Sequence, residues 1–225
     1  MLKKSWEKLW GKISTGLTPG TTPIDKNFWK LIPKKSLILE VGCGWGRIVF
    51  ECLKRGFNVV GIEINKKEVD DLNKKLSQLK LSTKVKIYNE SIKSTPFKDE
   101  TFSAVIMQGI LSALPKESRV DGLHEIYRIL KQNGYIHVAE FELITDNKKA
   151  TERYENDKLI TKEFGTLSVH DQYGEELYRT HNFTEKELTK LLESNNFNII
   201  SITKKTFLSY HDNKKPGLLI IAQKF

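Results

Sequence analysis

The feature that most restricts the fold of this chain is a glycine-rich turn between an apolar run and a helical run. Ser36–Gly42 (SLILEVG) is short, apolar and bounded by turn residues, which is typical of a buried strand. Glycines follow at positions 42, 44 and 46, and Arg47–Gly56 has the pattern of a helix that a glycine ends. Glycine loses more conformational entropy on folding than other residues, so this clustering indicates that something approaches the main chain closely.

Strands and helices alternate after this turn. Further apolar runs of strand length are Asn58–Ile64, Val85–Asn89, Phe102–Gln108 and Tyr135–Phe141. A helix is predicted after Asn65, whose side chain suits the N-cap position, and another over Ser118–Gly134, ending at Gly134. This alternation favours βαβ units and a parallel, doubly wound sheet of the α/β class.

The end of the chain departs from that alternation. Thr184 and Glu187 have the spacing of a capping box and predict a helix that continues through Leu191–Leu192. The apolar runs Asn198–Ile202 and Gly217–Gln223 then follow with no helix between them. Such a connection favours an antiparallel hairpin at the edge of the sheet.

Composition limits the class of protein. At 225 residues the chain suits one domain over residues 1–225, and no apolar run approaches the roughly 20 residues that cross a bilayer. We therefore expect a cytoplasmic protein without a membrane partner. Its two cysteines, Cys43 and Cys52, form no metal-binding pair, so no metal is expected. The net charge of +9 comes mostly from scattered lysines, which favours a solvated surface over a nucleic-acid partner.

The glycine turn predicts a nucleoside ligand when it is combined with a distant acid. Ligands of open α/β sheets bind at the carboxyl ends of the strands, where this turn would lie. Glu63 ends the second predicted strand about 20 residues further on, where a carboxylate can accept both hydroxyls of a ribose. The dinucleotide fingerprint would need glycine at position 47, but Arg47 stands there.

The pattern Glu40-x-Gly42-x-Gly44-x-Gly46 resembles the first motif of class I S-adenosylmethionine-dependent methyltransferases. The resemblance covers residues from about 36 to 225 and includes the stretches KSTPFKDETFSAVIM and IYRILKQNGYIHVAEF. It implies a Rossmann-like, mostly parallel seven-stranded sheet in three α/β/α layers, with an antiparallel C-terminal strand. It also implies S-adenosylmethionine as cofactor and S-adenosylhomocysteine as product.

The same resemblance implies roles for individual residues. Glu40 would assist near the amino group of the methionine moiety, Glu63 would hold the ribose, and Ile64 would pack on the adenine. Ser91 stands where many family members have an aspartate that faces the adenine. The residues expected at the cofactor are Glu40, Gly42, Cys43, Gly44, Gly46, Glu63, Ile64, Ser91, Ile92, Gln108 and Gly109.

Methyl transfer from a sulfonium needs a general base only where the acceptor must lose a proton. His181 and Glu140 are the two candidates. Residues 142–183 are too long for a simple connection and are expected to form a lid over the acceptor, while residues 1–32 form an N-terminal helical cap. A small-molecule methyltransferase is favoured; the alternatives are an RNA-modifying methyltransferase and a nicotinamide-dependent oxidoreductase. No motif specifies an oligomeric state.

Overall fold

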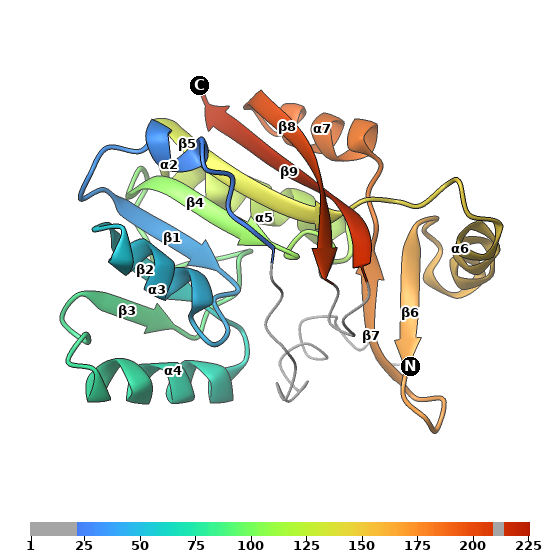
Figure 1. Ribbon diagram of the computed structural model, residues 1–225, viewed down its shortest axis with the longest axis horizontal. Helices are drawn as coiled ribbons and strands as arrows, with labels where there is room; N and C mark the ends of the chain where they lie inside the picture. Colours follow the sequence, from blue (N-terminus) through green and yellow to red (C-terminus); the bar gives the residue numbers. More distant parts are fainter. Residues whose placement is uncertain (1–21, 209–213) are drawn as a thin grey trace.

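A computed structural model describes residues 22–208 and 214–225, and its centre is a seven-stranded sheet (Figure 1). The strands, in the order in which they lie side by side, are β3 (Val85–Tyr88), β2 (Asn58–Ile62), β1 (Leu37–Val41), β4 (Phe102–Gln108), β5 (Leu130–Phe141), β9 (Lys214–Lys224) and β8 (Phe197–Leu208). The first five strands pair in parallel, whereas β9 is antiparallel to both β5 and β8. The predicted sheet and its closing antiparallel hairpin are confirmed.

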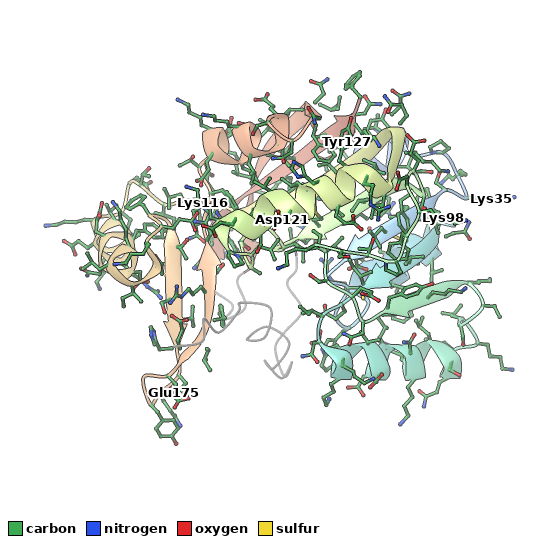
Figure 2. All side chains as sticks on the ribbon, turned by 180° about the vertical axis from the view of Figure 1, so that it is seen from behind. Lys35, Lys98, Lys116, Asp121, Tyr127 and Glu175 are labelled. Carbon is green, nitrogen blue, oxygen red and sulfur yellow. The ribbon has the colours of Figure 1, made fainter. Side chains whose placement is uncertain are left out.

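Helices cover both faces of the sheet, giving three layers. On one face lie α2 (Phe28–Leu31), α3 (Arg47–Lys54) and α4 (Lys66–Gln78), and on the other lie α5 (Lys116–Ile129) and α7 (Glu185–Glu193). Figure 2 shows the second face, with α5 crossing the sheet. Most of the N-terminal cap expected over residues 1–32 falls outside the described residues.

Side chains that alternate between the two faces of each strand divide the apolar core into two clusters. Ile38 and Ile106 pack in the apolar cluster that includes α2, α3 and α4, while Leu39 and Val105 pack in the cluster of α5 and α7. Successive side chains of a strand point to opposite faces, so a strand buried on both sides must be apolar at every position. This explains why the predicted strands were continuous apolar runs.

Two predicted helix starts are present. The Asn65 side chain accepts hydrogen bonds from the backbone N–H groups of Lys67 and Glu68, at 3.0 and 3.4 Å. Thr184 likewise accepts the N–H of Glu187 at 3.1 Å, but the Glu187 carboxylate lies against the His181 ring, 3.1 Å from Nε2. The two caps therefore begin α4 and α7 at the expected residues.

The predicted helix end at Gly134 is wrong. Helix α5 ends at Ile129 and β5 begins at Leu130, which pairs with Phe102 and is fully buried. The pairing of β4 with β5 is irregular before Ala104, and Asn133 there has a φ of +60°. Burial of Leu130 in the core stops the helix before its glycine, a tertiary effect that a local helix-ending signal does not report.

Residues 142–183 form a separate substructure at the carboxyl edge. They contain α6 (Lys148–Thr161) and a two-stranded sheet of β6 (Thr166–His170) and β7 (Glu176–His181). A single bridge between Glu142 and Phe183 closes their base, and β6 and β7 extend past the edge of the main sheet (Figure 1). In the described part of the chain, no helix is long and apolar enough to cross a membrane.

Candidate functional site

The glycine turn joins β1 to α3 at the carboxyl edge of the sheet. Gly42, Gly44 and Gly46 have φ values of +69°, +46° and +82°, in the left-handed region that favours glycine. A Cβ atom at Gly42 would collide with Ile110, and one at Gly46 would lie 2.7 Å from a methyl carbon of Leu72. Each glycine is thus required by backbone conformation, and two of them also by close packing.

The carboxylate of Glu63 is bound to this turn. Its Oε2 accepts the backbone N–H of Gly44 at 3.1 Å, and its Oε1 accepts that of Asn65 at 2.9 Å. Burial raises the pKa of Glu63, and these backbone hydrogen bonds oppose the rise. A carboxylate has about four acceptor positions, so two remain for the hydroxyls of a ribose.

Glu40 supplies a second carboxylate on the neighbouring strand. It is 4% exposed, and its Oε2 has no hydrogen-bond partner within residues 22–208 and 214–225. Burial raises its pKa well above the usual value, and the charge of Arg47 opposes that shift. A buried acceptor without a protein donor is costly, and a ligand ammonium group would satisfy it. The unpaired Glu40 carboxylate oxygen therefore fits the amino group of the methionine moiety of S-adenosylmethionine.

The end of β4 completes this side of the site. Gln108 Oε1 accepts a hydrogen bond from Arg47 Nη2 at 2.6 Å. Gly109 follows with a φ of +67°, and a Cβ atom there would meet no described atom within 4 Å. Residues 22–208 and 214–225 thus leave space open beside Gly109 at the end of β4. This end lies next to the glycine turn, because β1 and β4 are paired neighbours.

Three of the expected cofactor residues have side chains in packed or local contacts. The Cys43 thiol is buried in the core, where it lies against Gly61, and the side chain of Ile92 is buried against Gly122 of α5. The Ser91 hydroxyl oxygen accepts the backbone N–H of Lys93 at 3.3 Å. These residues can meet a ligand through their backbone, whereas Ile64 is half-exposed after β2.

Two further residues at this edge, Asn89 and Glu68, belong to no binding motif in the sequence. Asn89 Nδ2 donates to the backbone carbonyls of Glu63 and Ile64, each at 2.9 Å, and so holds the chain after β2. Glu68 lies beside Gly44 and is hydrogen-bonded by the Trp45 side chain; burial and the charge of Glu63 raise its pKa to about 7. Glu68 lies three residues after the N-cap Asn65, and its position beside the turn was not predicted from the sequence.

The two candidate bases are engaged by protein groups. Glu140 accepts the backbone N–H groups of Leu111 and Ser112 at 2.8 and 3.3 Å, and burial raises its pKa to about 7. His181 is buried, with Nδ1 2.8 Å from Thr166 Oγ1 and Nε2 3.1 Å from a Glu187 carboxylate oxygen. Neither geometry favours a group that faces an acceptor.

Glu163, His181 and Glu187 bring their potential ligand atoms within 4.8 Å of one another. Both carboxylate oxygens of Glu163 are paired with the Arg119 guanidinium, at 2.6 and 3.0 Å. The two carboxylates also meet opposite nitrogens of the His181 ring. This cluster therefore has the character of an ion-pair network that attaches residues 142–183 to α5 and α7, not of a metal centre.

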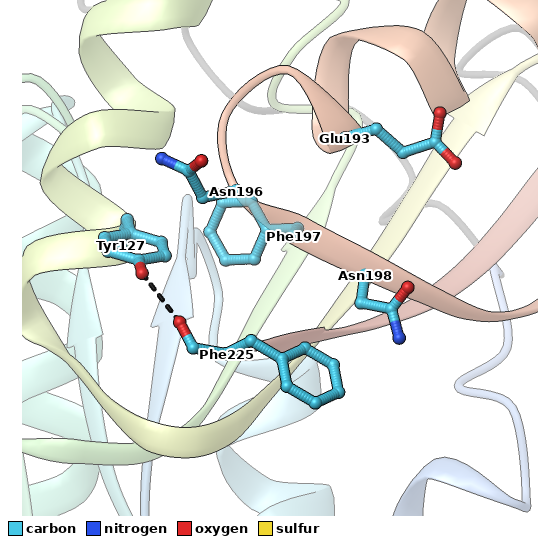
Figure 3. Close-up of a pocket in the computed structure, with 6 residues that line it drawn as sticks. All are labelled: Tyr127, Glu193, Asn196, Phe197, Asn198 and Phe225. Atoms are coloured by element: carbon cyan, nitrogen blue, oxygen red, sulfur yellow. Dashed lines mark hydrogen bonds between the residues drawn. The ribbon is translucent and has the colours of Figure 1, made fainter.

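A shallow pocket lies elsewhere (Figure 3). It is lined by Tyr127, Glu193, Asn196, Phe197, Asn198 and Phe225. Because β9 is antiparallel to β5, its C-terminal end, at Phe225, lies at the edge opposite the glycine turn. The Tyr127 hydroxyl donates to the backbone carbonyl of Phe225 at 2.8 Å, and no acid–base pair lines this pocket.

Comparisons with known proteins bear on the family of this chain. Residues 38–134 match the family described as methyltransferase domain. A solved structure described as a SAM-dependent methyltransferase from Methanosarcina mazei is 30% identical, with a TM-score of 0.85, and the match covers 91% of this chain and 99% of that one.

Curated relatives add two named enzymes. A demethylmenaquinone methyltransferase from Lactobacillus johnsonii is 28% identical, over 80% of this chain and 75% of the relative. A sterol 4-C-methyltransferase from Caenorhabditis elegans is 28% identical, over 60% of this chain and 40% of the relative. The chain thus spans about two fifths of the length of the sterol enzyme and of other curated relatives.

Proposed function

Because this chain belongs to the class I S-adenosylmethionine-dependent methyltransferases, we propose that it transfers a methyl group from this cofactor to a small organic acceptor. The observation that carries the proposal is the pair of buried carboxylates on either side of the glycine turn. Glu40 has an unsatisfied oxygen for an ammonium group, and Glu63 has acceptor positions left for a ribose.

When bound, the cofactor supplies a methyl group already activated on a positively charged sulfur. The residues of the chain then have to bind, align and exclude water. The first N–H groups of α3 would hold the methionine carboxylate, the main chain of the turn would lie against the methionine moiety, and Ile64 would pack on the adenine. Gln108 and Gly109, at the end of β4, would border the sulfur. Neither Glu140 nor His181 is used as a base in this proposal.

A small acceptor is supported by position and by the relatives. The relatives from Lactobacillus johnsonii and Caenorhabditis elegans are named for a quinone and a sterol, respectively. Residues 142–183 rise at the same edge as the glycine turn, where they can cover an acceptor (Figure 1). We propose that they form the lid and that the chain is a single methyltransferase domain.

Titration calorimetry with S-adenosylhomocysteine and with NAD tests the cofactor. We expect heat of binding with the former alone; binding of NAD alone would favour the nicotinamide alternative. Incubation with methyl-labelled S-adenosylmethionine then tests the acceptor, using quinols, sterols, other metabolites and RNA as separate arms. Label transferred to RNA, with binding that weakens steeply as salt is added, would replace the small-molecule proposal by RNA modification.

A further inference from the structure

The chain before α2 crosses the candidate site. We call residues 22–25 the strap. Arg47 Nη2 donates to the Thr22 carbonyl at 3.0 Å, and Gln108 Nε2 lies 3.5 Å from the Pro23 carbonyl. Figure 1 shows this stretch running from α2 down to the carboxyl edge of the sheet. The strap therefore lies next to the end of β4.

The two ends of the strap are held differently. Towards α2, Ile24 is buried, and the backbone N–H of Asp25 donates to Nε2 of the buried His137 ring at 3.1 Å. Phe28 is fully buried three residues later. At the other end, the described contacts are those of Arg47 and Gln108 with backbone carbonyls. Apolar burial and a backbone hydrogen bond thus anchor the end towards α2, while the Arg47 guanidinium and the Gln108 amide contact the other end.

Arg47 also belongs to the cofactor site. It is the first residue of α3, directly after the glycine turn, and its charge is the strongest influence that opposes the pKa rise of Glu40. The nitrogen that contacts Thr22 also holds Gln108 at 2.6 Å. A ligand ammonium group beside Glu40 would pair with its carboxylate and so weaken the electrostatic attraction between Glu40 and Arg47. Arg47 would then depend on Gln108 and Thr22 as its remaining partners.

We propose that Arg47 is a positioning residue that holds the strap against the end of β4, and holds it more firmly when the cofactor is bound, so that the strap forms one wall of the acceptor site. This inference rests on the proposed function. Open space beside Gly109 lies at the same strand end, so an acceptor that approaches the methyl group passes between Gly109 and the strap. Coupling of this kind is reciprocal: whatever holds the strap closed also strengthens cofactor binding.

Hydrogen exchange of the strap tests the coupling. In the wild-type protein, S-adenosylhomocysteine is expected to slow exchange of the amides in residues 22–28 about 10-fold, within the usual range of coupling between sites. Arg47→Met should keep the methylene length but remove the donors, so the ligand still binds, more weakly, and this protection is lost. Lys54→Met, at the exposed end of the same helix, is the control and should behave as wild type.

Two further variants separate positioning from folding. Gln108→Leu removes the other partner of Arg47 Nη2 and should also abolish ligand-dependent protection. Arg47→Lys retains the charge on a shorter side chain and should restore less than half of it. Unchanged protection in Arg47→Met, or full rescue by lysine, would overturn the inference. Ligand binding without any protection of the wild-type strap would do the same, whereas absence of ligand binding would overturn the proposed function itself.

Discussion

The glycine turn and residues 142–183 lie at the same edge of the sheet but are held in place by different means. The hydrogen bonds that fix the turn join its own backbone to Ile62 and to the Glu63 carboxylate, all within residues 42–65. Residues 142–183 are attached to the main body by the ion pair of Glu163 with Arg119, 44 positions away. Two contacts of His181 add to this, one with the Glu187 carboxylate and one from its backbone N–H to the Ser112 carbonyl. The comparison suggests that cofactor binding is encoded locally and acceptor access by long-range contacts.

The largest effect is expected from Arg119→Met. Arg119 is 2% exposed and pairs with both oxygens of Glu163, so its loss leaves a partly buried carboxylate without its cation. We expect about 3–5 kcal/mol of lost stability in the attachment of residues 142–183. Hydrogen exchange in β6 and β7 should rise. The S-adenosylhomocysteine affinity should stay within a factor of about two, because the described side-chain hydrogen bonds of Arg119 go to Leu111 and Glu163 and not to the glycine turn.

The control for that experiment is Lys148→Met. Lys148 is on α6, and its ion pair with Glu152 is solvent-exposed at 3.8 Å, so its loss should cost no more than about 1 kcal/mol. If cofactor affinity fell in step with the protection of β6 and β7, the two regions would be coupled and the comparison would fail.

Glu63→Ala should affect the turn and leave the attached region unchanged. Two hydrogen bonds from ribose hydroxyls to a charged acceptor contribute about 1.5–3 kcal/mol each. We expect S-adenosylhomocysteine to bind at least about 100-fold more weakly by calorimetry. Glu51→Ala, on α3 and paired with Arg55 at the surface, is the matched control. A loss below about fivefold would show that Glu63 serves only to hold the turn.

Gly42→Ala separates the conformational cost of a left-handed residue from an effect on cofactor binding. A left-handed φ costs a residue with a Cβ about 1–2 kcal/mol, and here Cβ also meets Ile110. Gly174→Ala, with a φ of +80° and open space around Cβ, has the same backbone cost in the β6–β7 hairpin. Both variants should melt earlier, but Gly42→Ala alone should weaken S-adenosylhomocysteine binding. Equal affinities in the two variants would contradict a close approach of the ligand to the turn.

The smallest effect is a pH dependence that involves Glu140. Burial raises its folded-state pKa from 4.5 to about 7, so the folded state binds its proton more tightly than the unfolded chain does. Stability therefore falls as pH rises from about 4.5 to 7. Glu140→Gln should reduce this fall by about 1 kcal/mol between pH 6 and pH 7, measured by denaturant unfolding at both pH values. An unchanged slope would mean that Glu140 is ionised throughout that range.

The locally encoded parts of the molecule were the predictable ones. The alternation of apolar runs predicted β1 to β4, and the Asn65 and Thr184 caps predicted the starts of two helices, because these patterns involve residues a few positions apart. Gly134 was misleading because burial of Leu130 ends α5 earlier. The contact of Arg47 with Thr22 had no sequence pattern, since the two residues meet only when the strap crosses the sheet.

The sequence alone determined the order of strands and helices, the family resemblance and the backbone that a cofactor can approach. Periodicity, caps and glycines act through neighbours in the chain, and their physical consequences do not depend on distant contacts. Only the tertiary structure decided which carboxylates remain unsatisfied, which bases are already engaged and where residues 142–183 attach. Those outcomes depend on burial and on hydrogen-bond partners brought together from far apart in the sequence.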